Sequence, residues 1–181
     1  MAKRDEKPAV ALGFLTVIEH EQHGLFGGYL VLNLAGRPLE FHCTAPVKPN
    51  RAQQILYGPT LEPYLYGEQI GQALCAKCAH DVLLICTDSP HVLALRSHTE
   101  TPVTLVLGDN SRAAMAAGRP SGPLVFAFGK NQLALPENRQ ADREVVLKRL
   151  QQIGEVFDLE EPFGRIRAAI EEAQRGSRAA A

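Results

Sequence analysis

The sequence contains no tryptophan, and only 6% of its 181 residues are aromatic. Proteins that bind single-stranded nucleic acid commonly stack bases on exposed rings, so this scarcity argues against a base-stacking platform. The sequence also lacks an excess of positive or negative charge. It has 19 Lys and Arg residues and 20 Asp and Glu residues, which gives a net charge of −1. Nucleic-acid-binding domains usually carry a basic face, and nucleic acid is therefore not expected as a partner.

No stretch of the chain approaches the roughly 18 consecutive apolar residues of a membrane-spanning helix, so no membrane partner is expected. The first eight residues carry charges of both signs, and the apolar run 9–17 is interrupted by Gly13 and Thr16. That run predicts a first strand instead of a signal peptide, and we expect a cytoplasmic, reducing location. Four cysteines in such a location favour free thiols or metal ligands over disulfides.

What is present is an ordinary globular composition, with 45% hydrophobic and 22% charged residues. The length suits one domain with a helical extension. We predict a flexible arm over residues 1–8, a single α+β domain over 9–136, a C-terminal helical pair over 137–175 that packs on the domain or extends from it, and a frayed tail over 176–181.

Alternating apolar and polar residues predict an antiparallel meander at the start of the chain, with one solvated face. Its three strands are expected at Val10–Glu19, Phe26–Leu34 and Leu39–Cys43. On the third strand, His42 and Cys43 point to opposite faces and cannot form a nucleophile with its base.

The periodicity then becomes helical. Asn50 and Thr60 are predicted to cap an inserted pair of helices over 51–57 and 61–79. Further strands, which close a mixed sheet, are expected over 82–86, 103–107, 124–128 and 132–135, the last of them at an edge. Residues 91–96 are expected as a strand or a helical turn, and residues 108–122 as a loop that can act as a flap. Two amphipathic helices follow Pro136, the second with Asp158 and Glu161 as its N-terminal signature.

The sharpest chemical motif is Cys75-Ala-Lys-Cys78, whose spacing lets two thiolates reach one Zn²⁺. The remaining ligands would come from Cys43, Cys86, His42 and His80. The alternative is that the cysteines are core residues, because all four fall where the pattern calls for a buried side chain. A redox dithiol is disfavoured, since both motif cysteines lie near the C-terminal end of a helix, where the dipole raises a thiol pKa. We expect no cofactor, with Zn²⁺ as the alternative.

Two further segments carry candidate polar sites. Asp88 follows the strand 82–86, and ligands of open α/β sheets bind beyond the carboxyl ends of such strands. It could hold a metal, a ribose or a catalytic proton, although a helix or turn cap before Pro90 is the interpretation we favour. Lys48 and Arg51 lie at a helix N-terminus, where they could bind an anion without the help of a glycine-rich loop.

Tyr57, Tyr64 and Tyr66 lie in one proline-bordered stretch that is typical of protein interfaces, although the same rings could seal the core. Phe163 and Ile166 on the last helix are candidates for the same role.

No nucleophile–base–oxyanion set and no complete metal set is apparent in the sequence. The leading hypothesis is therefore a cytoplasmic protein-interaction or accessory module without catalytic machinery, which binds another protein or a second copy of itself. The alternatives are a zinc-binding domain centred on Cys75 and Cys78, and a small-molecule enzyme with a pocket at Asp88.

Overall fold

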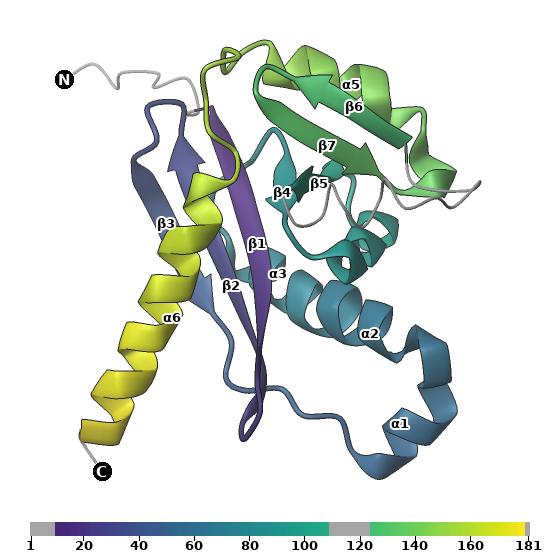
Figure 1. The fold of residues 1–181 in the computed structure, drawn as a ribbon, viewed down its shortest axis with the longest axis vertical. Coiled ribbons are helices and arrows are strands. Elements are labelled where there is room, and N and C mark those ends of the chain that lie inside the picture. Colours follow the sequence, from purple (N-terminus) through teal and green to yellow (C-terminus); the bar gives the residue numbers. More distant parts are fainter. Residues whose placement is uncertain (1–9, 109–123, 180–181) are drawn as a thin grey trace, which may run out of the picture.

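The computed structural model describes residues 10–108 and 124–179, with side chains up to residue 176. Seven strands form one mixed sheet in the order β3-β2-β1-β4-β5-β7-β6, and helices cover it (Figure 1). The α+β class and the inserted helical stretch are confirmed. The predicted arm and most of the predicted flap lie outside the described residues. The division into a domain and a helical pair stays a prediction.

The predicted antiparallel meander is confirmed, with β1 (Ala11–His20), β2 (Gly24–Asn33) and β3 (Pro38–Cys43). The predicted solvated face is wrong for β1 and β2, because residues of both strands enter the core on each side of the sheet. β1 pairs with β2 along its whole length, from Ala11 opposite Asn33 to His20 opposite Gly24. Both strands are buried over most of their length, so this pair forms the centre of the molecule.

The next two strands, β4 (Ile85–Thr87) and β5 (Val103–Leu107), run parallel to β1. Parallel strands bring their carboxyl ends to the same edge of a sheet. The hairpin of β6 (Leu124–Phe128) and β7 (Asn131–Leu135) completes the sheet. The expectation that residues 132–135 form an edge strand is wrong, because β7 lies between β5 and β6.

A capping box at Asn50 starts α1 (Arg51–Tyr57), as predicted. The chain then stays helical through η1 (Gly58–Thr60), α2 (Leu61–Pro63), η2 (Tyr64–Gln72) and α3 (Ala73–Lys77). Thr60 does not cap this stretch, since its hydroxyl donates to the carbonyl of Tyr57 at 2.7 Å. The η2 segment has the wider turn of a π-helix.

Residues 90–98 form the 3₁₀ helix η3 (Pro90–His98), which corrects the strand alternative for 91–96. It packs against η2 at Gly67, where an added Cβ would lie 2.8 Å from the Cβ of Ala94 and 2.8 Å from the backbone nitrogen of Leu95. The small residues of η2 thus allow close approach between two helices.

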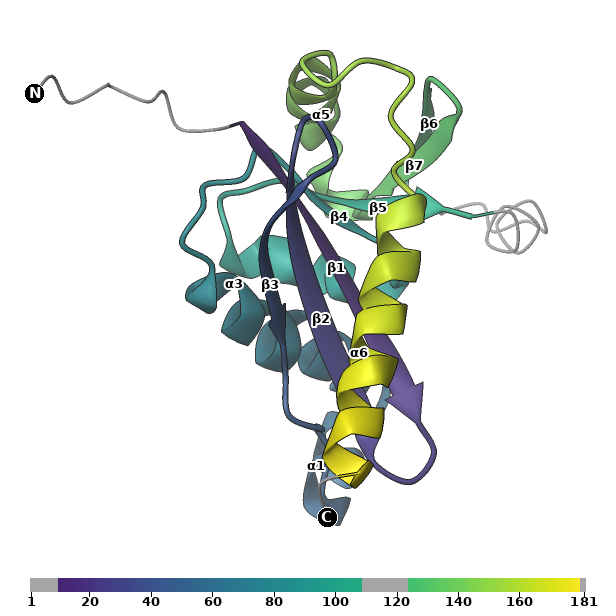
Figure 2. The same ribbon diagram turned by 90° about the vertical axis from the view of Figure 1, so that its left-hand side faces the viewer.

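The helices lie on opposite faces of the sheet, as Figure 2 shows for the 51–77 stretch and α6 (Glu161–Ala179). Asp158 caps α6 as predicted, with Oδ1 accepting from the N–H groups of Glu160 and Glu161. The short η4 (Glu137–Arg139) and α5 (Asp142–Leu150) precede it. None of the helices in the described ranges is long and apolar enough to cross a membrane.

Phe163 and Ile166, predicted as part of an interaction surface, are 1% and 0% exposed. They belong to the core beneath α6, and that prediction is wrong because the apolar stripe of the helix faces β1 and β2. Ile166 and Ile170 occupy the space that a side chain at Gly28 on β2 would need. The glycine therefore seats α6 close against the sheet.

Candidate functional site

Asp88 directly follows β4 and reaches across to β1. The register places Leu15 opposite Thr87, so that Thr16 and Asp88 are the next residues along two parallel strands. The hydroxyl of Thr16 donates to Asp88 Oδ1 at 2.6 Å. Thr16 is 1% exposed, and this buried donor therefore fixes one oxygen of the carboxylate.

The second oxygen of Asp88 faces α6, where Arg167 Nη2 forms an ion pair with it. The carboxylate is 18% exposed and the arginine side chain 48% exposed, so that the pair lies at the surface of the site. The favoured interpretation of Asp88 as a cap is wrong. η3 starts without a side-chain cap, and the N–H of Ser89 donates to the hydroxyl of Thr87 instead.

The end of β5 contributes a second carboxylate. β5 is followed by Gly108, and an added Cβ there would lie 2.7 Å from Oε1 of Glu160. Glu160 is held at this place because its own N–H donates to Asp158 at the start of α6. The residues that follow β4 and β5 thus each lie with a carboxylate, and the one after β4, Asp88, also contacts a buried hydroxyl and an exposed arginine.

The fold is similar to that of human Endonuclease V. Two crystal structures of the human protein, one of them of its catalytic domain, each match with a TM-score of 0.52 and 13% identity. They cover 96% and 95% of this chain, and 87% and 89% of their own. Endonuclease V of Ciona intestinalis, in complex with a DNA that contains an inosine followed by a ribo-adenosine, matches with a TM-score of 0.40 and 10% identity over 80% of this chain and 86% of that one. No protein-family model and no curated protein matches the sequence.

The matches to human Endonuclease V contradict the leading hypothesis of an accessory module without catalytic machinery, because the fold is shared with a nucleic-acid enzyme. For the same reason, these matches contradict the expectation that nucleic acid is not a partner. The first prediction rested on the absence of a recognisable catalytic motif, and the second on totals of charge and aromatic residues. Neither observation carries information about which fold the chain adopts.

Nucleases often hold two divalent ions between several carboxylates. Within residues 10–108 and 124–179, no group of three or more His, Cys, Asp or Glu side chains is placed to hold a metal ion. At the carboxyl ends of β4 and β5, Asp88 already pairs with Arg167, and its neighbour on β1 is the hydroxyl of Thr16. The described residues at this edge do not fit a two-metal centre.

The cysteines predicted as zinc ligands do not converge. Cys86 lies in the core beneath α6, Cys75 and Cys78 pack on the opposite face, and Cys43 is exposed. Burial raises the pKa of the Cys75 thiol to about 12. Burial and a hydrogen bond to Glu40 raise the pKa of the Cys78 thiol to about 11. Zn²⁺ binds thiolates, which these pKa shifts disfavour.

His80 contacts Glu40 on β3 instead of the four cysteines, with 3.3 Å between Nδ1 and Oε1. His42 approaches the other oxygen of the same carboxylate, with 3.5 Å between Nε2 and Oε2. The N–H of Ala79 donates to both oxygens. The hydrogen bond from the Cys78 thiol is the largest of the contacts that lower the pKa of Glu40 from 4.5 to about 2.

Lys48 and Arg51, predicted to bind an anion together, form hydrogen bonds with different residues. Lys48 Nζ donates to the carbonyl of Gln22 at 3.4 Å, and Arg51 Nη1 donates to the side chain of Gln54 at 3.4 Å. Both contacts are exposed, so that the predicted anion site has no converging pair of cations.

The predicted tyrosine stretch divides into two parts. The rings of Tyr57 and Tyr64 stack with centroids 4.3 Å apart, and a hydrogen bond between them raises the pKa of Tyr57. Tyr66 instead meets the edge of His91 at 5.4 Å, and burial raises its pKa. Tyr64 and Tyr66 are partly buried against the core, and Tyr57 contacts it through the ring of Tyr64. The role of this stretch in a protein interface stays a prediction.

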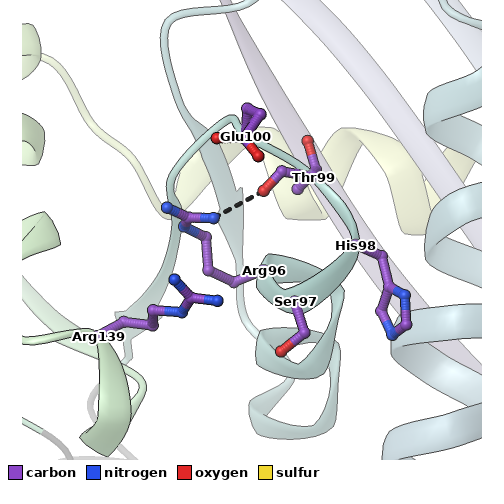
Figure 3. Close-up of a pocket in the computed structure, with 6 residues that line it drawn as sticks. All are labelled: Arg96, Ser97, His98, Thr99, Glu100 and Arg139. Carbon is purple, nitrogen blue, oxygen red and sulfur yellow. Dashed lines mark hydrogen bonds between the residues drawn. The ribbon is translucent and has the colours of Figure 1, made fainter.

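A polar pocket of about 350 Å³ lies at the end of η3, where no sequence signal pointed (Figure 3). Arg96 crosses it, donating to the carbonyl of Thr99 at 2.7 Å and to Asp142 at 2.6 and 3.2 Å. Because Arg96 is engaged in holding η3 to α5, we interpret the pocket as structural.

Thr16, Glu160 and Arg167 are the site residues that the sequence reasoning missed. Thr16 was detectable as the one hydroxyl in the apolar run of the first strand. Glu160 and Arg167 could be recognised only once the position of α6 against the sheet was known. No periodic pattern in the sequence distinguishes Arg167 from the other arginines of that helix.

Proposed function

We propose that the chain binds nucleic acid at the carboxyl ends of β4 and β5, beside Thr16 of β1, and acts there on its phosphodiester backbone. The observation that carries this proposal is the Asp88 carboxylate, held by Thr16 and Arg167 at that edge. In open sheets with parallel strands, ligands bind beyond the carboxyl ends of the strands. The resemblance to human Endonuclease V supports nucleic acid as the ligand.

Each residue of the centre has a chemical role in this proposal. Asp88 accepts a proton from the water that attacks phosphorus, as carboxylates do in general base catalysis. The new P–O bond forms as the bond from phosphorus to one ester oxygen breaks, and the proton passes from Asp88 to that leaving oxygen. Thr16 orients the carboxylate through its hydrogen bond to Oδ1. Arg167 lies where it can stabilise negative charge on the phosphoryl oxygens. The cytoplasmic location belongs to the same proposal, and the four free cysteines support it.

The test measures binding and cleavage together. Fluorescence anisotropy is recorded with labelled single-stranded and duplex DNA and RNA, and products are resolved on denaturing gels. We expect binding that weakens as salt rises, because phosphate contacts release counterions. Cleavage is expected from the unmodified protein and not from Asp88→Asn, which keeps the shape and removes the base.

The control is Glu144→Gln. Glu144 is an exposed carboxylate on α5, far from Asp88 in the sequence, and its substitution removes the same charge. Its cleavage rate should equal that of the unmodified protein. Absence of binding to every oligonucleotide at about 50 mM salt would overturn the proposal, since non-specific binding is strongest there. Binding with equal cleavage by Asp88→Asn would remove Asp88 from its assigned role.

A further inference from the structure

The centre at Asp88 pairs its carboxylate with an arginine where a two-metal nuclease would gather several carboxylates. Resting on the proposed function, we propose that Arg167 takes the place of a divalent cation at this edge: its guanidinium binds a backbone phosphate of nucleic acid, and this binding needs no metal ion.

The position of Arg167 is fixed by the residues beside it. Ile166 precedes it in α6 and is fully buried against Gly28 of β2, and Ile170 packs against the same glycine. The start of the helix is held separately by the cap at Asp158. A cation seated in this way is pre-organised, so that little conformational entropy is lost when a phosphate binds.

The guanidinium of Arg167 retains donors for a ligand. In the described part of the chain its hydrogen bond to Asp88 uses Nη2, whereas a guanidinium carries five N–H donors in one plane. The side chain is 48% exposed, which leaves part of that plane open to solvent. Arginine binds phosphate through two parallel N–H···O bonds, a geometry that lysine lacks.

Other arginines of α6 are engaged within or beside their own helix. Arg165 donates to Glu161 one turn earlier and to the carbonyl of Gly36. Arg175 lies 4.0 Å from Glu171 and from Glu172. Only Arg167, among these three, is paired with a carboxylate at the end of a sheet strand, which places its charge at the candidate centre.

The experiment compares binding with and without metal. Anisotropy titrations of a labelled single-stranded DNA and its duplex are run in excess EDTA and in excess Mg²⁺, with the unmodified protein, Arg167→Gln, Arg167→Lys and Arg175→Gln. The last variant is the matched control, because it removes the same charge from the same helix away from Asp88. Urea midpoints of all variants establish that each is folded.

We expect equal affinity in EDTA and Mg²⁺, a loss of at least about tenfold for Arg167→Gln, and a salt dependence reduced by about one unit of slope. Arg167→Lys should bind with intermediate affinity, because the charge remains and the planar pair of donors is lost. Arg175→Gln should bind within about twofold of the unmodified protein.

Binding that appears only with Mg²⁺ would overturn the inference and leave the proposed function intact. Equal affinities of Arg167→Gln and Arg175→Gln for the DNA would also overturn the inference and leave the proposed function intact. Absence of binding by the unmodified protein in both buffers would overturn the proposed function and this inference with it.

Discussion

At the scale of single residues, Thr16 is a buried donor whose acceptor carries a charge. Thr16→Val keeps the branched shape and removes the hydroxyl, leaving Asp88 without its bond to β1. Hydrogen bonds to charged groups contribute about 1.5–3 kcal/mol, and we expect the free energy of unfolding to fall by about 2 kcal/mol. Urea unfolding at neutral pH measures this loss.

Thr104 provides the matched control, because it too is a buried strand residue, and its hydroxyl donates at 3.1 Å to the neutral carbonyl of Ala134. Thr104→Val should therefore lower the free energy of unfolding by only about 1 kcal/mol. Equal losses in the two variants would show that the charge on Asp88 adds nothing to the Thr16 bond.

Glu40 gives the chain a specific response to acid. Its pKa is lowered from 4.5 to about 2, chiefly by the Cys78 thiol and also by the N–H of Ala79 and by His80. Because the folded pKa lies below the unfolded one, the stabilisation is fully present above the unfolded value of 4.5 and is lost as pH falls towards 2.

We expect Glu40→Gln to flatten this acid limb of the stability curve, as measured by urea midpoints between about pH 6 and pH 2. Glu144→Gln removes an exposed carboxylate and should leave the slope of the limb unchanged. The expectation fails if both variants follow the curve of the unmodified protein.

At the scale of elements, local periodicity was sufficient to predict the strands of the meander and the two C-terminal helices. It could not reveal which strands pair across long separations. The parallel contacts of β4 with β1 bring Asp88 to Thr16 across 72 positions, and no local pattern encodes that meeting. Asp88 was thus recognised as a candidate from its place after a buried strand, whereas both of its partners were missed.

The contact of η2 with η3 depends on the absence of a side chain at Gly67. Gly67→Ala places a Cβ 2.8 Å from the Leu95 backbone and from Ala94, so that η3 must move. We expect a loss of about 1–3 kcal/mol in the free energy of unfolding, as for overpacked cores. Thermal or urea unfolding measures the change.

Gly164→Ala is the matched control for Gly67→Ala, because a Cβ at this position of α6 would meet nothing within 4 Å. Alanine favours helices over glycine by about 0.8–1 kcal/mol, and this variant should be as stable as the unmodified protein or more so. A similar loss in both variants would show that steric contact with η3 is not the cause.

At the scale of the whole molecule, averages misled the sequence reasoning. A net charge of −1 and sparse aromatic residues argued against nucleic acid. The charges of Arg167 and Asp88 cancel in the net charge, yet the fold places both of them at the candidate site. The recognition surface of a protein is decided by where a fold places a few side chains, which composition cannot report.

Among the contacts between the two halves of the chain is the ion pair of Arg96 and Asp142, whose side chains are 13% and 12% exposed. Arg96 belongs to η3, and Asp142 begins α5 beyond the β6–β7 hairpin. Asp142→Asn leaves the charge of Arg96 largely buried without its partner, and breaking such a pair costs about 3–5 kcal/mol. We expect a loss near the lower figure, because the carbonyl of Thr99 remains as an acceptor.

Urea unfolding followed by circular dichroism and by tyrosine fluorescence measures this loss and its cooperativity. If the transitions followed by the two probes coincide, the molecule unfolds as one cooperative unit, and the loss applies to the whole fold. The exposed carboxylate of Glu171 beside Arg175 is the control, and Glu171→Gln should change the free energy of unfolding by less than about 0.5 kcal/mol. Equal effects of the two variants would mean that the Arg96–Asp142 pair adds nothing to the stability of the fold.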